Sequence, residues 1–364
     1  MPLRASLHKR VFEFSFNART SRGAMKEKIS WFIKVWDESN PAIVGMGECG
    51  PLPGLSPEYD SVPDWEPLIE EINQETFDLP TLNGLTEVNT LINKLLHGKK
   101  EINHSSLLFG LETALLDWSN GGTKLIFSGD FLKGKPIPIN GLIWMGGLDF
   151  MLQQIELKIR DGFTCLKLKV GGHDFEKECD VLQYIRRKYF RDKITIRLDA
   201  NGAFKKENAL NKLKELSRFG IHSIEQPIKP GMTEMEELCR QSPIPVALDE
   251  ELIGVTGLAE RRTLLSRIKP PYIILKPSLH GGLFSCQEWI RVCEELGIAW
   301  WITSALESNI GLNAIAQFTS QYNVVLSQGL GTGQIYSNNI DSPLTVENGQ
   351  LHYNKAAFWG KIDD

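Results

Sequence analysis

The chain has 364 residues, which is enough for about two domains of average size or for one large barrel with an added domain. Its composition, 42% hydrophobic and 23% charged with 32 glycines and 18 prolines, excludes a disordered or fibrous protein. A formal net charge of −5 without long runs of like charge argues against a dedicated surface for nucleic acid or for an anionic membrane.

The first 133 residues predict a separate α+β unit. Apolar and polar residues alternate in KRVFEFSF (9–16), KISWFIKVW (28–36) and AIVGMGECG (42–50), which is typical of antiparallel strands. The segment SLLFGLETALLDWSNG (106–121) has the apolar spacing of a helix that ends at Asn120 and Gly121. We expect these elements to form a unit of their own over residues 1–133.

From about residue 135, short apolar runs alternate with helical patterns, which indicates parallel βα units. The candidate strands are 136–144, 164–170, 195–201, 222–228, 245–251, 272–278, 299–306 and 324–331. Helical patterns between them include 176–190, 207–220 and 284–297. Eight such strands predict a (β/α)₈-type barrel over residues 134–334. An open doubly wound sheet is the alternative, although no G-x-G-x-x-G follows the first strand.

The tail, residues 335–364, predicts two short strands around a Glu-Asn-Gly turn within SPLTVENGQLHYN. Because a barrel of eight strands is already closed, we expect this segment to pack on the N-terminal unit. The fold class predicted is therefore α/β, a barrel with an α+β capping domain built from the N-terminal part and the C-terminal tail.

Several other features limit the setting of the protein. No apolar stretch approaches the roughly 20 residues of a transmembrane helix, and the start of the chain lacks the continuous apolar core of a signal peptide. The six cysteines include no C-x-x-C pair, which argues against a zinc knuckle or a dense disulfide scaffold. We expect a cytoplasmic protein with reduced thiols and no membrane partner.

Charged side chains lie at the ends of strands that otherwise look buried. They are Lys167, Lys169, Asp199, Glu225, Asp249 and Lys276. An unpaired buried charge costs several kcal/mol, so these groups should contact one another or a metal ion. The carboxyl ends of barrel strands meet at one mouth, and consecutive charges are about one βα unit apart. We therefore expect one shared pocket.

The three carboxylates, Asp199, Glu225 and Asp249, predict a metal site. Hard oxygen ligands on neighbouring strands suit Mg²⁺, with Mn²⁺ as the alternative, whereas zinc is a poor match. A lysine beside such a cation and another ammonium is shifted towards the neutral amine, so it can act as a base near neutral pH. The implied chemistry is proton abstraction next to a carboxylate, on a small-molecule substrate.

Five motifs in this order resemble the enolase superfamily: K-x-K (167–169), LDAN (198–201), IEQP (224–227), LDEE (248–251) and LKPSLHGG (275–282). K-x-K together with Lys276 resembles the muconate lactonizing subgroup. The resemblance covers nearly the whole chain and implies a Mg²⁺-dependent enzyme.

Within that subgroup, TSALESNIGLNAIAQ (303–317) is most similar to the o-succinylbenzoate synthases of menaquinone biosynthesis. The resemblance implies syn dehydration of 2-succinyl-6-hydroxy-2,4-cyclohexadiene-1-carboxylate through an enediolate. Lys169 would remove the proton and then help hydroxide leave, and Lys276 would stabilise the enediolate. Lys167 would lower the basicity of Lys169 and contact the substrate carboxylate.

The substrate-binding residues expected from the resemblance include two arginines of the loop 17–28, which is suited to closing over an anionic substrate. The full set is Arg19, Arg22, Asn201, Ser304, Glu307 and Ser308. Of the LDEE run, only one side chain can face the metal, so we expect Glu250 and Glu251 to pair with nearby bases.

Two other functions remain open. An N-acylamino acid racemase or a dipeptide epimerase would use the same lysines for 1,1-proton transfer, although QGLGTGQ (328–334) lacks the acidic residues with which dipeptide epimerases hold an ammonium group. The alternative of another class is a non-catalytic barrel that binds a metal and a carboxylate. Lysines on both sides of the site argue against it, because binding alone does not require two proton-transfer groups.

Overall fold

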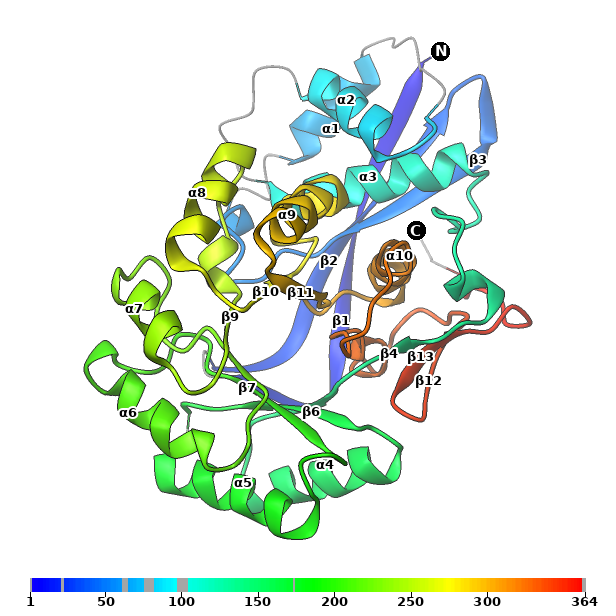
Figure 1. Ribbon diagram of the computed structural model, residues 1–364. Coiled ribbons are helices and arrows are strands. Elements are labelled where there is room, and N and C mark those ends of the chain that lie inside the picture. The colour runs from blue at the N-terminus through cyan, green and yellow to red at the C-terminus, as the bar shows by residue number, and fades with distance from the viewer. Residues whose placement is uncertain are drawn as a thin grey trace.

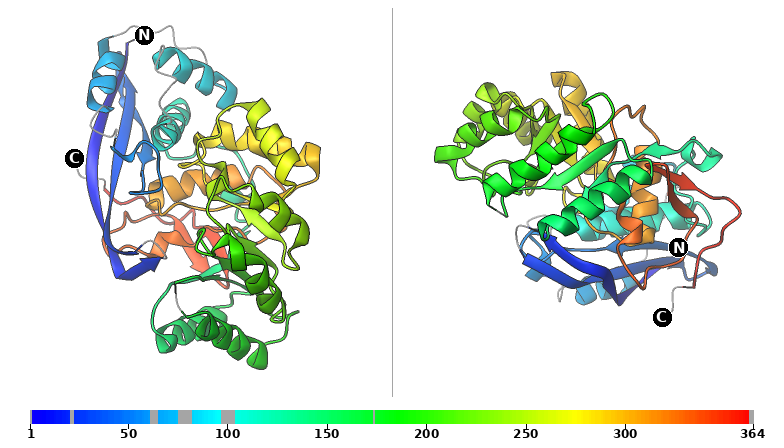
Figure 2. Two further views of the ribbon diagram at one scale, coloured as in Figure 1. Left: turned by 90° about the vertical axis from the view of Figure 1, so that its left-hand side faces the viewer. Right: turned by 90° about the horizontal axis from the view of Figure 1, so that it is seen from below.

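The structure, a computed structural model, describes residues 2–20, 23–60, 65–74, 82–96, 104–172 and 174–361. The first part of the chain forms an antiparallel sheet with three helices, and most of the remainder forms a curled parallel sheet with helices outside it (Figure 1). In a side view, the long strands of the first unit lie along one flank of the molecule (Figure 2). The predicted combination of an α+β unit with a parallel α/β unit is confirmed.

The N-terminal unit is built on the strands that alternation predicted. β1 (Leu3–Thr20) pairs with β2 (Gly23–Asp37), and β2 pairs with β3 (Asn40–Cys49), both in antiparallel fashion. The helices are α1 (Trp65–Gln74), α2 (Leu85–Leu95) and α3 (Ser105–Ser119). Gly47 allows α3 to lie directly on β3, because a Cβ atom there would be 1.9 Å from the carbonyl oxygen of Gly110.

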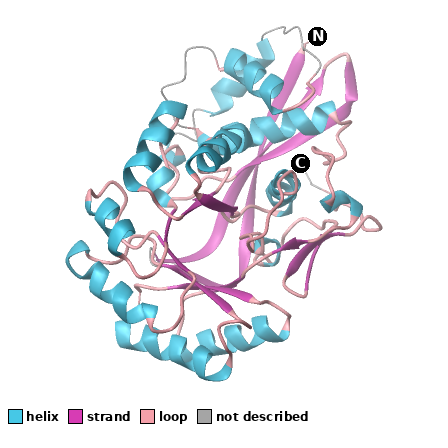
Figure 3. Cartoon of the chain, in the orientation of Figure 1, coloured by secondary structure: helices cyan, strands magenta, loops and turns pink. Residues whose placement is uncertain are grey.

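The second unit alternates strands and helices, as Figure 3 shows. Its parallel strands are β5 (Gly141–Ile143), β6 (Cys165–Lys169), β7 (Thr195–Asp199), β8 (Ser223–Glu225), β9 (Val246–Leu248), β10 (Tyr272–Leu275) and β11 (Ala299–Ile302), hydrogen-bonded in this order. Its helices are α4 (Leu148–Arg160), α5 (Phe175–Lys188), α6 (Lys206–Ser217), α7 (Glu234–Gln241), α8 (Leu258–Ile268), α9 (Gly282–Leu296) and α10 (Asn309–Thr319). Short 3₁₀ turns occur at η2 (Phe131–Lys133), η3 (Glu250–Leu252) and η4 (Thr332–Gln334).

Seven of the eight expected strands form the parallel sheet of the described residues. The segment predicted as the eighth strand, 324–331, forms only isolated parallel bridges, from Gly329 to Thr303 and from Gln328 to Ile139. Two glycines lie in it, and glycine is depleted in strands because it has no side chain to pack and a high entropic cost of ordering. A closed eight-stranded barrel is therefore not formed by regular strands.

The C-terminal segment contacts both units. The predicted hairpin is present, with β12 (Leu344–Glu347) and β13 (Gln350–Tyr353) joined through Asn348 and Gly349, both at positive φ. β13 pairs with β4 (Ile137–Pro138) and not with the N-terminal sheet. The residues just before the hairpin do reach that sheet, since Ser15 N donates to Ile335 O at 2.8 Å. The tail thus joins the start of the parallel unit to β1.

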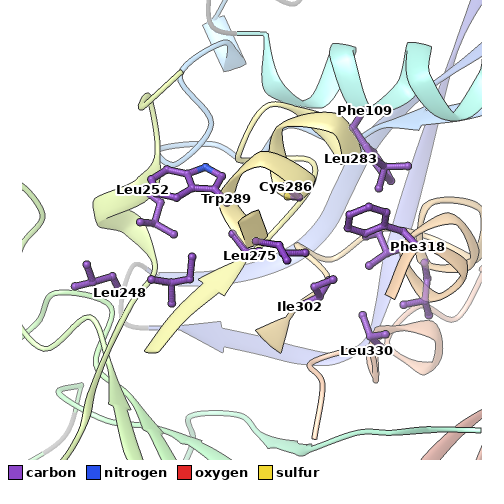
Figure 4. Packing of buried hydrophobic residues seen from close by; sticks show 14 of the residues in the cluster. Phe109, Leu248, Leu252, Leu275, Leu283, Cys286, Trp289, Ile302, Phe318 and Leu330 are labelled. Carbon is purple, nitrogen blue, oxygen red and sulfur yellow. The ribbon is translucent and has the colours of Figure 1, made fainter. Parts of the chain in front are cut away.

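One continuous hydrophobic core spans the boundary between the units. Figure 4 shows Phe109 of α3 beside Leu283 of α9, with Trp289 and Leu275 further along the same core. All six cysteines are free, as predicted. Among the helices that the structure describes, none is both long and apolar enough to cross a membrane.

A buried glutamate of the N-terminal unit binds the start of a helix in the parallel unit. The carboxylate of Glu112 on α3 accepts hydrogen bonds from Leu283 N at 2.5 Å and from Phe284 N at 3.2 Å, in the first turn of α9. Burial raises the pKa of Glu112 to about 8, although the two N–H groups act in the opposite direction. This contact holds the loop after β10 against the N-terminal unit.

The raised pKa predicts a stability that falls with rising pH. Between about pH 4.5 and pH 8 the folded chain keeps a proton on Glu112 that the unfolded chain has released, so the free energy of unfolding decreases as the pH increases. Glu112→Gln keeps the carbonyl acceptor and cannot ionise. We expect the wild type to lose about 4 kcal/mol relative to this variant between pH 5 and pH 8.5, measured by urea unfolding. A difference that does not change with pH would contradict this assignment.

Candidate active site

The charged residues singled out in the sequence lie at the carboxyl ends of neighbouring strands. Lys169, Asp199 and Glu225 are the last residues of β6, β7 and β8, and the sheet register pairs Lys169 with Asp199 and Asp199 with Glu225. Asp249 directly follows β9, and Lys276 directly follows β10. The parallel register therefore brings residues that are far apart in the sequence to one edge of the sheet.

These side chains form an alternating series of ammonium and carboxylate groups. In order, its members are Lys169, Asp199, Lys167, Glu225, Lys276 and Asp249. Asp199 Oδ2 lies 3.0 Å from Lys169 Nζ and 3.1 Å from Lys167 Nζ. Glu225 Oε2 lies 2.5 Å from Lys167 Nζ, and its Oε1 lies 3.4 Å from Lys276 Nζ, which also pairs with Asp249 Oδ2. Each buried charge thus has a partner of opposite sign.

Asp199 and Glu225 are both buried in this series, but their pKa values shift in opposite directions. Burial would raise the pKa of Asp199, but the ammonium groups of Lys167 and Lys169 outweigh it and lower the pKa well below the usual range. Burial, and next the repulsion from Asp199, raises the pKa of Glu225 to about 7. The series therefore holds one strongly ionised carboxylate beside one that is easily protonated.

Two of the lysines are kept charged by this arrangement. Burial would lower the pKa of Lys167 and of Lys276, but the neighbouring carboxylates reverse the direction and raise both. The sequence predicted a lysine shifted towards the neutral amine beside a divalent cation. These side chains by themselves do not produce that shift at Lys167 or Lys276, because every carboxylate in the series stabilises an ammonium.

The donor set fits a hard divalent cation. The three carboxylates come from adjacent strand ends, and Asp249 Oδ1 is buried without a hydrogen-bond partner among the described residues. Within the part of the chain that the structure describes, no three Asp, Glu, His or Cys side chains are already gathered as a metal site, since Lys167 and Lys276 lie between the carboxylates. Asp199, Glu225 and Asp249 could hold Mg²⁺ once these ammonium groups move aside.

A cavity of about 790 Å³ opens at this edge of the sheet. Both units line it, because residues at the start of β2 and in the loop 52–55 face the strand ends of the parallel sheet. All three lysines of the series reach it, together with Asp199. Its volume is typical of a site that encloses a small molecule.

Of the residues predicted to bind substrate, two line the cavity. Asn201 Oδ1 accepts from Lys169 Nζ at 2.8 Å, while Asn201 Nδ2 donates to Glu250 Oε1 at 3.1 Å. Ser304 Oγ donates to Glu307 Oε2 at 2.5 Å and lies 2.7 Å from Thr332 Oγ1. Asn201 thus orients Lys169, and Ser304 presents a hydroxyl that is held by its neighbours.

Glu307 and Ser308 are placed differently from the prediction, because neither lines the cavity. Glu307 is fully buried, and its carboxylate accepts from Ser278 Oγ and Ser304 Oγ, both at 2.5 Å. Ser308 caps α10, and its N–H and hydroxyl donate to Glu48 of β3. Both residues hold the wall of the cavity in position. The sequence alone does not tell whether a polar residue beside a strand end lines a cavity or supports its wall.

The segment 17–28 was expected to be a loop, but its described residues are in strands, since residues 17–20 end β1 and residues 23–28 begin β2. Arg19 belongs to β1, paired with Ala24, but its side chain is not among those described, and Arg22 lies outside the described residues. Glu250 and Glu251 also make contacts with polar groups near the strand ends. Glu250 Oε1 accepts from Asn201, and the carboxylate of Glu251 accepts from Gln226 Nε2 at 3.1 Å and from the N–H of Gly231.

Sequence reasoning missed Gln226, which links two strand ends. Its Oε1 accepts from Asp249 N and Glu251 N, each at 3.2 Å, and its Nε2 donates to Ile228 O at 3.0 Å. It is fully buried at a φ of 38°, which a residue other than glycine adopts only at a cost. The available signal was its position directly after Glu225 in IEQP.

Comparison with known proteins places these motifs in a family. Residues 151–357 match the family model described as enolase C-terminal domain-like. An o-succinylbenzoate synthase of Desulfotalea psychrophila is 44% identical over 356 residues, which cover 93% of this chain and 95% of that protein. The crystal structure of MenC from the same organism superposes with a TM-score of 0.85 at 40% identity, over 97% of this chain and 100% of that one.

More distant structures share the fold. A dipeptide epimerase from Enterococcus faecalis V583, complexed with Mg and L-Leu-L-Tyr, superposes with a TM-score of 0.82 at 19% identity over 98% of both chains.

The contacts of Gln226 predict that it positions a metal ligand. Gln226→Leu removes the acceptor for the N–H of Asp249, so we expect Mg²⁺ affinity, measured by isothermal titration calorimetry, to fall about 10- to 100-fold. Gln241→Leu is the matched control, because Gln241 is exposed at the end of α7 and its side chain donates to Glu237 of the same helix. This variant should leave the affinity unchanged. Equal affinity in wild type and Gln226→Leu would contradict the role.

Proposed function

The chain belongs to the enolase superfamily, and we propose that it is an o-succinylbenzoate synthase, a lyase that dehydrates 2-succinyl-6-hydroxy-2,4-cyclohexadiene-1-carboxylate. The observation that carries the proposal is the alternating series of three lysines and three carboxylates around a cavity of molecular size. Binding alone does not require lysines on both sides of such a site, whereas proton abstraction followed by charge stabilisation does.

The similarity to known enzymes supports dehydration over epimerisation. The relative at 44% identity is named o-succinylbenzoate synthase, whereas an L-Ala-D/L-Glu epimerase of Bacillus subtilis is 24% identical over 47% of this chain. The segment 328–334 also carries no acidic side chain that could bind the ammonium group of a dipeptide.

Lys169 is the group that moves the proton. It lies at the end of β6, at the edge of the series, where Asp199 and Asn201 orient its Nζ atom. As a neutral amine, Lys169 takes the proton from the carbon that bears the carboxylate. The resulting ammonium then gives this proton to the departing hydroxide on the same face, so that the C–O bond breaks, the ring becomes aromatic and one water leaves.

Lys276 stabilises the charge that develops between these two events. Its ammonium group lies at the other end of the series from Lys169, next to Glu225 and Asp249. A fixed positive charge lowers the energy of the enediolate more than that of the substrate, because the enediolate carries one more negative charge than the substrate carboxylate. Lys167, between Asp199 and Glu225, is placed to disfavour protonation of Lys169 and to contact the substrate carboxylate.

Mg²⁺ is the proposed cofactor, held by Asp199, Glu225 and Asp249. When bound, it supplies positive charge next to the substrate carboxylate, where the negative charge of the enediolate accumulates. Asp199, which pairs with Lys169, would at the same time bind the cation, and the added positive charge next to Lys169 favours its neutral amine.

Some of the remaining site residues are proposed to contact the substrate, and others to support the cavity wall. Asn201 and Ser304 line the cavity and are proposed to touch the substrate. Arg19, near the end of β1, and Arg22 are proposed to touch it as well. Glu307 and Ser308 are proposed to act through Ser304 and through the turn before α10. We also infer that the segment 328–331 takes the eighth position of a closed barrel. Its backbone bonds to the strands on both sides: Gly329 N donates to Ile302 O, and Gln328 exchanges backbone hydrogen bonds with Pro138 and Asn140.

The test is a dehydration assay on the purified protein with Mg²⁺. Lys169→Ala should lower kcat about 10²- to 10⁴-fold or more without changing the melting temperature greatly, because the side chain acts in chemistry and lies at the edge of the series. Lys206→Ala is the matched control, since Lys206 pairs with Glu234 on the surface and should leave kcat unchanged. Full turnover by Lys169→Ala would contradict the assignment.

The same preparation separates the competing functions. Deuterium exchange into N-succinyl amino acids without any dehydration would favour a racemase. Mg²⁺ binding without turnover of either class of substrate would favour a binding protein.

Removal of the metal gives an independent prediction. We expect dialysis against EDTA to abolish dehydration and added Mg²⁺ or Mn²⁺ to restore it, because both ions accept three carboxylate oxygens. Asp249→Asn should require at least about tenfold more Mg²⁺ for half-maximal activity. Activity that survives in EDTA would remove the metal from the mechanism.

A further inference from the structure

Two polar side chains in the cavity have no part in the proposed reaction. Asn140 is 5% exposed and Thr303 is 9% exposed, and both line the cavity with the lysines. Asn140 Oδ1 and Thr303 Oγ1 are buried without a hydrogen-bond partner among the described residues. Buried polar groups are normally paired, so two unpaired ones facing one cavity indicate partners that a ligand supplies.

The backbone places these residues in a row that begins at Lys276. Thr303 N donates to Leu275 O at 2.8 Å, which puts Thr303 beside Lys276 in the parallel register. Thr303 in turn forms a parallel bridge with Gly329. Asn140 N donates to Gln328 O at 2.9 Å, so Asn140 lies beside Gly329 on the other side.

Gly329 keeps the space between the two side chains open. A Cβ atom at this position would lie 2.5 Å from Thr303 Oγ1, closer than side-chain carbons are found to approach. Because the row has no side chain at its centre, the hydroxyl of Thr303 and the amide of Asn140 border one recess. The glycine that interrupts the predicted eighth strand is therefore also what leaves room for a ligand.

The recess differs in charge from the opposite part of the mouth. The carboxylates come from β7, β8 and the end of β9, whereas the row from Thr303 to Asn140 holds a hydroxyl, a glycine and an amide. A neutral recess of hydrogen-bonding groups accepts oxygen atoms of a ligand without the repulsion that a carboxylate would impose. The carboxylate at the reacting carbon of the ligand would instead contact the lysines and the proposed metal on the opposite side of the cavity.

We propose that Thr303 and Asn140 form a subsite for the oxygen atoms of the succinyl chain and determine the specificity for it. This inference rests on the proposed function, which supplies a substrate with a succinyl group. The Thr303 hydroxyl donates to a succinyl oxygen. The Asn140 amide, whose Oδ1 accepts no hydrogen bond from the described residues, turns its N–H to the same group.

Thr303→Val tests the subsite with the smallest change, because it replaces only a hydroxyl by a methyl group. Removing an unpaired buried hydroxyl leaves the melting temperature unchanged or raises it, whereas kcat/KM for the succinyl substrate falls about 10- to 100-fold. We expect the same pattern for Asn140→Leu. A residue with a purely structural role would give the opposite pattern, a lower melting temperature with kcat/KM unchanged.

Thr319→Val is the matched control. Thr319 is buried in α10, and its hydroxyl donates to Ile315 O at 2.7 Å, away from the cavity. This variant should have a lower melting temperature and an unchanged kcat/KM. If Thr303→Val behaves like Thr319→Val, the subsite is overturned.

Direct binding of three aromatic acids, measured by calorimetry with Mg²⁺ present, identifies the oxygen that is bound. If Thr303→Val weakens o-succinylbenzoate but not 2-butyrylbenzoate, the subsite binds the terminal carboxylate. If it weakens both, the subsite binds the ketone, and in either case the affinity for benzoate stays unchanged. An equal loss for benzoate would overturn the proposal, because benzoate has no succinyl chain.

These measurements also distinguish the inference from the function on which it rests. A wild type that binds o-succinylbenzoate but does not turn over its precursor would remove the proposed dehydration, while the affinity ratio between wild type and Thr303→Val would still support or overturn the subsite. Normal turnover with equal affinities in both proteins would overturn the subsite alone. No binding of o-succinylbenzoate to the wild type would overturn both.

Discussion

The structure depends on the burial of three ammonium and three carboxylate groups at one edge of the parallel sheet. A single ammonium or carboxylate at these positions would carry a desolvation cost that the rest of the fold could not easily offset. The cost is met only because the strands bring lysine and carboxylate side chains into alternation, from Lys169 to Asp249.

The same alternation links the stability of the site to its chemistry. Three carboxylates that neutralise lysines are also the oxygen donors that a hard cation prefers, so the two uses compete for the same atoms. The different acidities of Asp199 and Glu225 show how strongly position within the series affects each group. A site with this balance can change the charge of its lysines when one positive partner is exchanged for another.

The N-terminal unit does more than cover the cavity. Two of its buried glutamates bind the first turns of helices in the parallel unit: Glu112 at α9 and Glu48 at α10. These helices follow β10 and β11, so the loops that carry Lys276 and Ser304 are fixed on both sides. The wall of the cavity is therefore formed by both units, although the three lysines of the series belong to one.

The sequence by itself determined the α+β and α/β units, the strands that carry each charge and the family, because periodicity and the order of motifs are local properties. It did not determine that the segment 324–331 pairs only through single bridges, or that Glu307 and Ser308 support the cavity wall without lining it. Nor did it reveal the link made by Gln226. These features depend on register and on which side chains meet across strands, and such contacts are decided only when distant parts of the chain pack together.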